Sequence, residues 1–139
     1  MADVLIAILK FPNDPTNNHT AHQMFLATQT ETTIDLYSVS SILGKEKRVY
    51  GPDKDDYLTI IPPEDSLNEF KVPSFIDCTK MYQVAISNAV NLSALSQRSL
   101  SAELHQKIIA KISEKKAEGK HTVYSISEAD FVLWNPKVK

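Results

Sequence analysis

The sequence predicts a mainly β domain of the α+β class, folded as a small closed β barrel with one helix packed on it near the C-terminal end. The 139 residues fit a single domain. Five or six short segments with strand-like patterns come first, separated by turn residues. Only one segment has a strong helical pattern, and it follows the strands instead of alternating with them, which argues against repeated βαβ units.

Apolar or alternating residues mark the strands, and turn residues separate them. The expected strands are Val4–Leu9, Met24–Thr28, Thr32–Val39, Tyr57–Ile61 and Ser74–Val84. The last of these is expected to bend near Thr79–Lys80. Between the strands, Pro12–His22 predicts an exposed loop, Gly44–Arg48 a charged connector, and Gly51–Asp56 a solvated turn.

The helix is expected to begin after Ser101 and to end at Gly119, because a serine hydroxyl caps a helix start and glycine suits the residue after a helix end. One face carries Leu104, Ile108, Ile109 and Ile112. The lysines at 107, 111, 115 and 116 are expected to solvate the outer face. A short strand over His121–Ile126 follows. We treat residues 1–139 as one domain in which 119–139 is a C-terminal extension.

Composition excludes several classes of protein. The net charge is −2, so nucleic-acid binding would need a local basic patch. The single cysteine, Cys78, can form neither an intramolecular disulfide nor a cysteine-based zinc site, and we expect it to be buried. Three glycines and no phosphate or metal motif leave no cofactor or metal to expect. Without a signal-peptide pattern or a long apolar run, we expect a cytoplasmic protein with no membrane contact.

Two groups of polar residues are candidates for chemistry. His19 and His22 lie in the expected loop, where imidazoles with near-neutral pKa values suit general acid–base catalysis. Ser38, Ser40 and Ser41 close an expected strand and offer hydroxyls to phosphate oxygens. The alternatives are surface histidines in a polar loop and ordinary turn chemistry.

Basic residues supply a candidate nucleic-acid contact. A basic cluster just after the serines consists of Lys45, Lys47 and Arg48. Such a cluster either meets a phosphate backbone or is a solvated connector. Lys80 and Tyr82 alternate along a later strand, where tyrosine is able to stack on a base.

The segment Phe70-Lys71-Val72-Pro73-Ser74-Phe75-Ile76-Asp77-Cys78-Thr79-Lys80-Met81-Tyr82-Gln83-Val84 resembles the late strand of the MazF/PemK/Kid toxin family. In that family a Lys-x-Pro-Ser lead precedes an apolar strand, often a Cys-Asp-Gln core, and then Arg-Thr. The order of elements is also similar over residues 2–116, including the segment Asn91–Ser96 and the helix after it. The extension from Gly119 has no counterpart.

The resemblance implies a closed SH3-like barrel, usually dimeric, that acts as the toxin of a toxin–antitoxin pair. Such toxins are metal-independent endoribonucleases that cut single-stranded RNA, and an acidic antitoxin covers the RNA groove. The ribose 2′-OH attacks the adjacent phosphate, with a base to take its proton and cations to stabilise the phosphorane.

Several family positions carry other residues here. The Arg-Pro after the first loop falls at about His22-Gln23, and the Asp and Gln after the cysteine fall at Thr79 and Lys80. The following Arg falls at Tyr82. Neither Arg48 nor Arg98 falls on a matching catalytic position, whereas the serine closing the third strand is kept as Ser40 or Ser41.

We therefore expect RNA cleavage by a rebuilt site. His22, or alternatively His19, would be the acid or base, Ser40 the phosphate contact and Lys80 the oxyanion stabiliser. RNA would be bound by Lys45, Lys47, Arg48, Thr79 and Tyr82. The alternative is a catalytically degenerate barrel that binds nucleic acid or a protein partner without cleavage.

Overall fold

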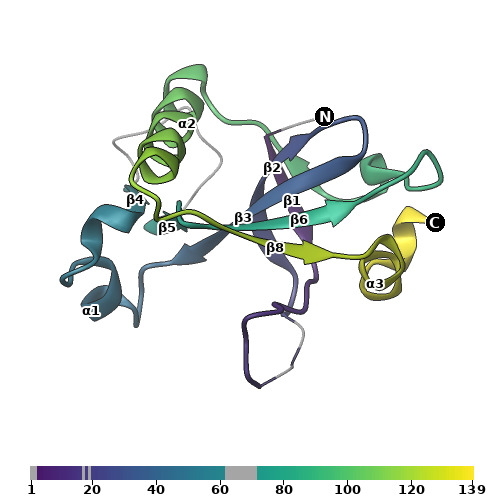
Figure 1. Ribbon diagram of the computed structural model, residues 1–139, viewed down its shortest axis with the longest axis horizontal. Coiled ribbons are helices and arrows are strands. Elements are labelled where there is room, and N and C mark those ends of the chain that lie inside the picture. The colour runs from purple at the N-terminus through teal and green to yellow at the C-terminus, as the bar shows by residue number, and fades with distance from the viewer. Residues whose placement is uncertain (1–2, 17, 19, 62–71) are drawn as a thin grey trace.

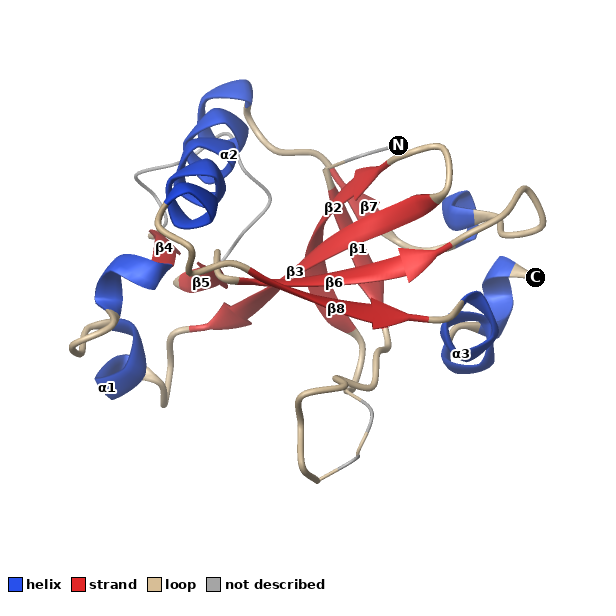
Figure 2. Cartoon of the chain, viewed as in Figure 1, coloured by secondary structure: helices blue, strands red, loops and turns tan. Residues whose placement is uncertain are grey.

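The computed structural model describes residues 3–16, 18, 20–61 and 72–139, and in this part of the chain eight strands form one sheet flanked by three α-helices (Figures 1 and 2). The strands are β1 (Val4–Ala7), β2 (Gln23–Gln29), β3 (Thr33–Ser41), β4 (Tyr57–Ile60), β5 (Ser74–Asp77), β6 (Lys80–Ala85), β7 (Gln97–Arg98) and β8 (Thr122–Ile126). The helices are α1 (Glu46–Val49), α2 (Ala102–Ala117) and α3 (Glu128–Trp134). Short 3-10 turns occupy Lys54–Asp56, Leu92–Ala94 and Pro136–Val138.

The sheet is antiparallel except for the parallel pair β6–β8. Its strand order is β4-β5-β3-β2-β1-β7, with β6 on β3 and β8 on β6. Within the described residues the sheet does not close, so the expected closed barrel is not confirmed. In the described part of the chain the sheet branches at β3, and each of the strands β4, β7 and β8 pairs with a single neighbour, so three edges remain open. Closure into a barrel needs every strand to pair on both sides.

The long strand β3 changes partner along its length. Its first half pairs with β6, with Leu36 opposite Tyr82, and its end pairs with β5, with Val39 opposite Ile76. The segment expected as one bent strand is therefore two strands, which separate at a tight turn after Asp77. The Asp77 carboxylate stabilises that turn, because its Oδ1 accepts hydrogen bonds from the Thr79 amide at 3.0 Å and the Thr79 hydroxyl at 2.6 Å.

Helix α2 forms where the sequence predicts it and covers one side of the sheet (Figure 1). The Ser101 side chain accepts a hydrogen bond from the Leu104 amide at 3.2 Å, and Gly119 takes a left-handed φ of 72° after the helix end. The buried Leu104, Ile108 and Ile112 pack in one cluster with residues of β1 to β6 and with Cys78 in the turn between β5 and β6. The expected burial of Cys78 is confirmed.

Lys115 corrects the expectation that all the helix lysines are solvated. Its side chain is fully buried, and its Nζ contacts Asp55 at 2.7 Å, Glu118 at 2.9 Å and Asp56 at 3.4 Å. A buried ammonium is tolerated only when it is paired in this way. The turn after α1, expected to be merely solvated, thus anchors α2, and Lys111 and Lys115 lower the pKa of Asp55 to about 2.

The extension beyond Gly119 adds a strand to the sheet and contributes to a second buried cluster, separate from the one under α2. Strand β8 lies beside β6, and Ile126, Phe131 and Val138 join the buried cluster around Phe25. The helix α3 was not expected, nor was α1, which replaces the charged connector. Among the described residues, no helix has the length and apolar character needed to cross a bilayer.

Candidate functional site

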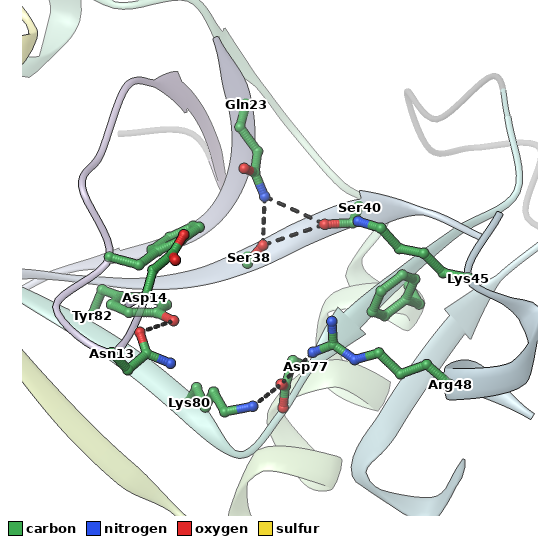
Figure 3. A pocket seen from close by; sticks show the side chains of 12 residues that line it. Asn13, Asp14, Gln23, Ser38, Ser40, Lys45, Arg48, Asp77, Lys80 and Tyr82 are labelled. Atoms are coloured by element: carbon green, nitrogen blue, oxygen red, sulfur yellow. Dashed lines mark hydrogen bonds and ion pairs between the residues drawn. The ribbon is translucent and has the colours of Figure 1, made fainter. Parts of the chain in front are cut away.

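A cleft of about 230 Å³ opens beside the place where β5 and β6 separate (Figure 3). Strands β2 and β3 supply one wall, α1 and the residues around the β5–β6 turn supply another, and the loop after β1 supplies the third. Twelve side chains line it: Phe11, Asn13, Asp14, Gln23, Ser38, Ser40, Lys45, Arg48, Phe75, Asp77, Lys80 and Tyr82.

Two hydroxyls lie together on one wall. Ser38 and Ser40 are two residues apart on β3 and therefore share a face of the strand. Their Oγ atoms are 3.4 Å apart, and the Gln23 amide donates hydrogen bonds to both (Figure 3). This amide fixes the two oxygens, whose own hydrogens are able to turn toward a ligand.

Two cations lie on either side of a buried carboxylate across the cleft. Asp77 Oδ2 contacts Lys80 Nζ at 3.2 Å and Arg48 Nη2 at 3.4 Å, and the Asp77 side chain is 7% exposed (Figure 3). Both cations keep solvent access, with 48% of the Arg48 side chain and 37% of the Lys80 side chain exposed. They are thus positioned by Asp77 and still able to meet an anion from solution.

Aromatic rings fix the guanidinium further. Arg48 Nε donates a hydrogen bond to the Tyr57 hydroxyl at 3.0 Å, which raises the pKa of Arg48. Its Cζ lies 5.3 Å from the Tyr57 ring centre and 5.7 Å from that of Phe75. Lys45 Nζ lies 5.8 Å from the same Phe75 ring. These cation–π contacts place a third positive charge at the mouth of the cleft.

Tyr82 lines the cleft, but its ring is enclosed. Phe11 lies 4.7 Å away and Tyr124 5.5 Å away, both at low angles to the Tyr82 ring, and Tyr82 is 4% exposed. Its hydroxyl donates to Asn13 Oδ1 at 3.0 Å, and burial raises the pKa of Tyr82 to about 12. The Tyr82 ring therefore has too little exposed surface for the base stacking expected from the sequence. Instead, Tyr82 holds Phe11 by ring packing and Asn13 by its hydrogen bond.

The structure brings together six of the residues singled out in the sequence: Ser38, Ser40, Lys45, Arg48, Lys80 and Tyr82. His22 lies in a neighbouring hollow of about 430 Å³, which shares Gln23, Ser40 and Lys45 with the cleft. Lys47 and Thr79 do not line the cleft. His19 lies outside the described residues.

Six cleft residues were not predicted from the sequence, and two of them, Asp77 and Gln23, organise the other side chains of the cleft. The family resemblance predicts site residues after Cys78, whereas the carboxylate that positions the two cations belongs to the residue just before Cys78. A signal was present: Asp77 is the one charged residue in the apolar run Ser74–Cys78, and Thr79 two residues later is typical of an Asp-centred turn. Gln23 gave no signal, because its role depends on the pairing of β2 with β3.

A cluster of carboxylates elsewhere is already occupied by lysine. Asp55, Glu114 and Glu118 have oxygens within 4.8 Å of one another, and all three are exposed. Lys111 contacts the first two at 2.7 and 3.2 Å, and Lys115 contacts Asp55 and Glu118. These ammonium groups sit where a metal ion would have to bind. The cluster lines none of the cleft.

Comparison with known proteins adds no further constraint. No protein-family model, no curated protein and no solved structure matches this chain.

Proposed function

We propose that the cleft binds a phosphodiester of single-stranded RNA and that the protein cleaves it without a metal ion. One observation carries this proposal: the paired hydroxyls of Ser38 and Ser40 lie in the same cleft as three cations, Lys45, Arg48 and Lys80. Hydroxyls and fixed cations are the groups that proteins use to hold phosphate oxygens.

The arrangement assigns a role to each group. Ser40 would hold a non-bridging oxygen of the phosphate, and Lys80 would stabilise the negative charge that grows on the phosphorane. The ribose 2′-oxygen forms a bond to phosphorus while the bond from phosphorus to the 5′-oxygen breaks. The products are a 2′,3′-cyclic phosphate and a 5′-hydroxyl. His22, from the adjoining hollow, would take the 2′ proton or protonate the leaving oxygen.

The biological setting follows from the resemblance to the MazF/PemK/Kid family. On that basis the protein is a divergent toxin with a PemK-like barrel, works as a homodimer in the cytoplasm, and is covered by an acidic antitoxin. The Lys-x-Pro-Ser lead of the resembling segment begins at Lys71, which lies outside the described residues. Asp77, Lys80 and Tyr82, from the rest of that segment, line the cleft.

A second candidate is binding without cleavage. It is favoured by the position of His22, which lines a neighbouring hollow and not the cleft itself. The described lining of the cleft contains no imidazole.

The test is incubation of the purified protein with a long single-stranded RNA in EDTA, followed by mapping of fragment ends. Discrete cuts with cyclic-phosphate ends support the nuclease, and their loss in Lys80→Gln places the chemistry in the cleft. Lys107→Gln, which removes an exposed lysine of α2, is the matched control. RNA that is bound but intact supports the second candidate. RNA that is neither bound nor cut by folded protein contradicts both.

A further inference from the structure

A further hollow, of about 290 Å³ and distinct from the one that His22 lines, adjoins the cleft. The two share Phe11 and Asp14, which stand on the boundary between them. The far wall comes from the C-terminal extension, which contributes Ser125, Ser127, Asp130 and Trp134. A ligand that fills the cleft and continues past Phe11 therefore enters a space built by the part of the chain for which the resembling family offers no counterpart.

The chemistry of this hollow differs from that of the cleft. The cleft has three cations and two carboxylates in its lining, whereas the hollow has one cation, Lys10, and the carboxylates of Asp14 and Asp130. The hydrogen bonds that Thr16 donates to Asp14 Oδ1 lower the pKa of that carboxyl, so Asp14 is ionised at neutral pH. A phosphate is disfavoured where acceptors and negative charge dominate.

A nucleobase matches the same lining well. It has a flat apolar face, which the half-buried indole of Trp134 is able to cover by stacking. Its amino group, where it has one, donates hydrogen bonds to a carboxylate, the pairing that Asp and Glu make with cytosine N4. Because the hollow and the cleft share Phe11, a base in the hollow would belong to a nucleotide that adjoins the phosphate in the cleft.

We propose that this hollow is a base subsite, which holds the nucleotide next to the bound phosphate and prefers a base with an amino group, such as adenine or cytosine, over uracil. The inference rests on the proposed function, because it takes RNA as the ligand of the cleft. The preference follows from the two carboxylates, which accept hydrogen bonds from an amino group. The one ring donor of uracil, N3–H, lies between two carbonyl oxygens that repel a carboxylate.

The test uses binding, so that cleavage does not interfere. Hexanucleotides of A, C and U with 2′-O-methyl groups cannot be cut by 2′-OH attack, and their affinities are measured by fluorescence anisotropy. We expect the native protein to bind the A and C hexamers about tenfold more tightly than the U hexamer, the lower end of what one hydrogen bond to a charged group contributes. Asp130→Asn should reduce the preference for A and C over U, because it leaves Asp14 as the one carboxylate in the described lining of the hollow. Asp53→Asn, a charge change in an exposed turn, should leave the preference unchanged.

Substitutions of Trp134 test the stacking contact independently of the hydrogen bond to Asp130. Trp134→Leu should weaken all three hexamers about tenfold, the loss expected for one stacked base, and Trp134→Phe should restore most of the binding. Thermal melts of both variants show whether the fold is kept. If Trp134→Leu unfolds the protein, the Asp130 arm decides the question by itself.

The outcomes separate the subsite from the function on which it rests. Equal affinities of the native protein for A, C and U, or a preference that Asp130→Asn leaves unchanged, overturn the base subsite. Lys80→Gln should weaken all three hexamers alike, and in that case the cleft remains a phosphate site even if the subsite fails. If folded native protein binds no hexamer, both proposals are overturned.

Discussion

The side-chain amide of Asn135 makes two hydrogen bonds with the backbone of Ile8, one to its carbonyl and one from its amide, as the backbone of a neighbouring strand would. Asn135 Nδ2 donates to the Ile8 carbonyl at 2.8 Å, and the Ile8 amide donates to Asn135 Oδ1 at 2.9 Å. The same Nδ2 donates to the Phe131 carbonyl at 3.0 Å, and Asn135 is 5% exposed. The extension thus satisfies the backbone of the chain just after β1, three residues before Phe11 enters the cleft.

Asn135→Ala should therefore destabilise the protein. The substitution leaves the amide and the carbonyl of Ile8 without partners in a place that water reaches poorly, and we expect a loss of about 2–4 kcal/mol in the free energy of unfolding. Urea denaturation measures it. Asn88→Ala, at an exposed turn position, is the control and should change stability by less than about 0.5 kcal/mol. Equal stabilities of the two variants would contradict the role given to Asn135.

The contact between Asn135 and Ile8 is an example of a feature that local sequence patterns do not predict. Local patterns placed most of the strands, the helix start at Ser101 and the stop at Gly119, because alternation, capping hydroxyls and glycine act within a few residues. The pairing of Asn135 with Ile8 joins residues 127 positions apart. No local pattern marks such a contact, and the open edges of the sheet depend on long-range pairing in the same way.

The residues of the candidate site also differ in whether local sequence patterns could predict them. Ser40, Lys45 and Lys80 were predictable from residue type and from the resemblance. The role of Asp77 was not, because it depends on the separation of β5 from β6 and on the arrival of Arg48 from α1. An arginine outside every family motif position reaches the cleft through a helix that the sequence did not predict.

His22→Ala tests the assignment of the proton-transfer group. His22 is exposed and lies in the hollow next to the cleft, so its removal should leave the thermal melt nearly unchanged. Loss of a general acid or base should lower the rate of RNA cleavage about 100-fold or more, with little change in RNA affinity. His105→Ala, on α2, is the control for loss of an imidazole. A cleavage rate of His22→Ala equal to that of the native protein would remove His22 from the mechanism.

Asp77→Asn separates the positioning of the cations from their charge. The asparagine keeps an oxygen for Thr79, so the turn between β5 and β6 should persist. Because Arg48 and Lys80 are both partly exposed, losing their ion pairs should cost only about 1 kcal/mol of stability. With the competing carboxylate neutralised, RNA should bind about threefold to tenfold more tightly at low salt. An affinity lowered by the substitution would mean that Asp77 serves the ligand directly.

The pH dependence of stability should report on His121, whose Nε2 lies 2.7 Å from the Tyr37 hydroxyl. Partial burial, with a further contribution from Lys116, lowers the pKa of His121 in the folded protein. The unfolded chain, with an ordinary pKa of about 6.5, therefore binds more protons than the folded one below that pH, and stability falls as the pH drops. The contribution of His121 is complete above about pH 6.5 and is lost progressively below it.

His121→Gln isolates this contribution, because the glutamine oxygen accepts from the Tyr37 hydroxyl and does not titrate. Unfolding free energies measured by urea denaturation at about pH 7.5 and about pH 5.5 should differ more in the native protein than in the variant. Carboxylates and the remaining histidines contribute equally to both and cancel in the comparison. The same pH dependence in the two proteins would show that His121 is as easily protonated in the fold as in the unfolded chain, and that its contact with Tyr37 does not depend on a neutral ring.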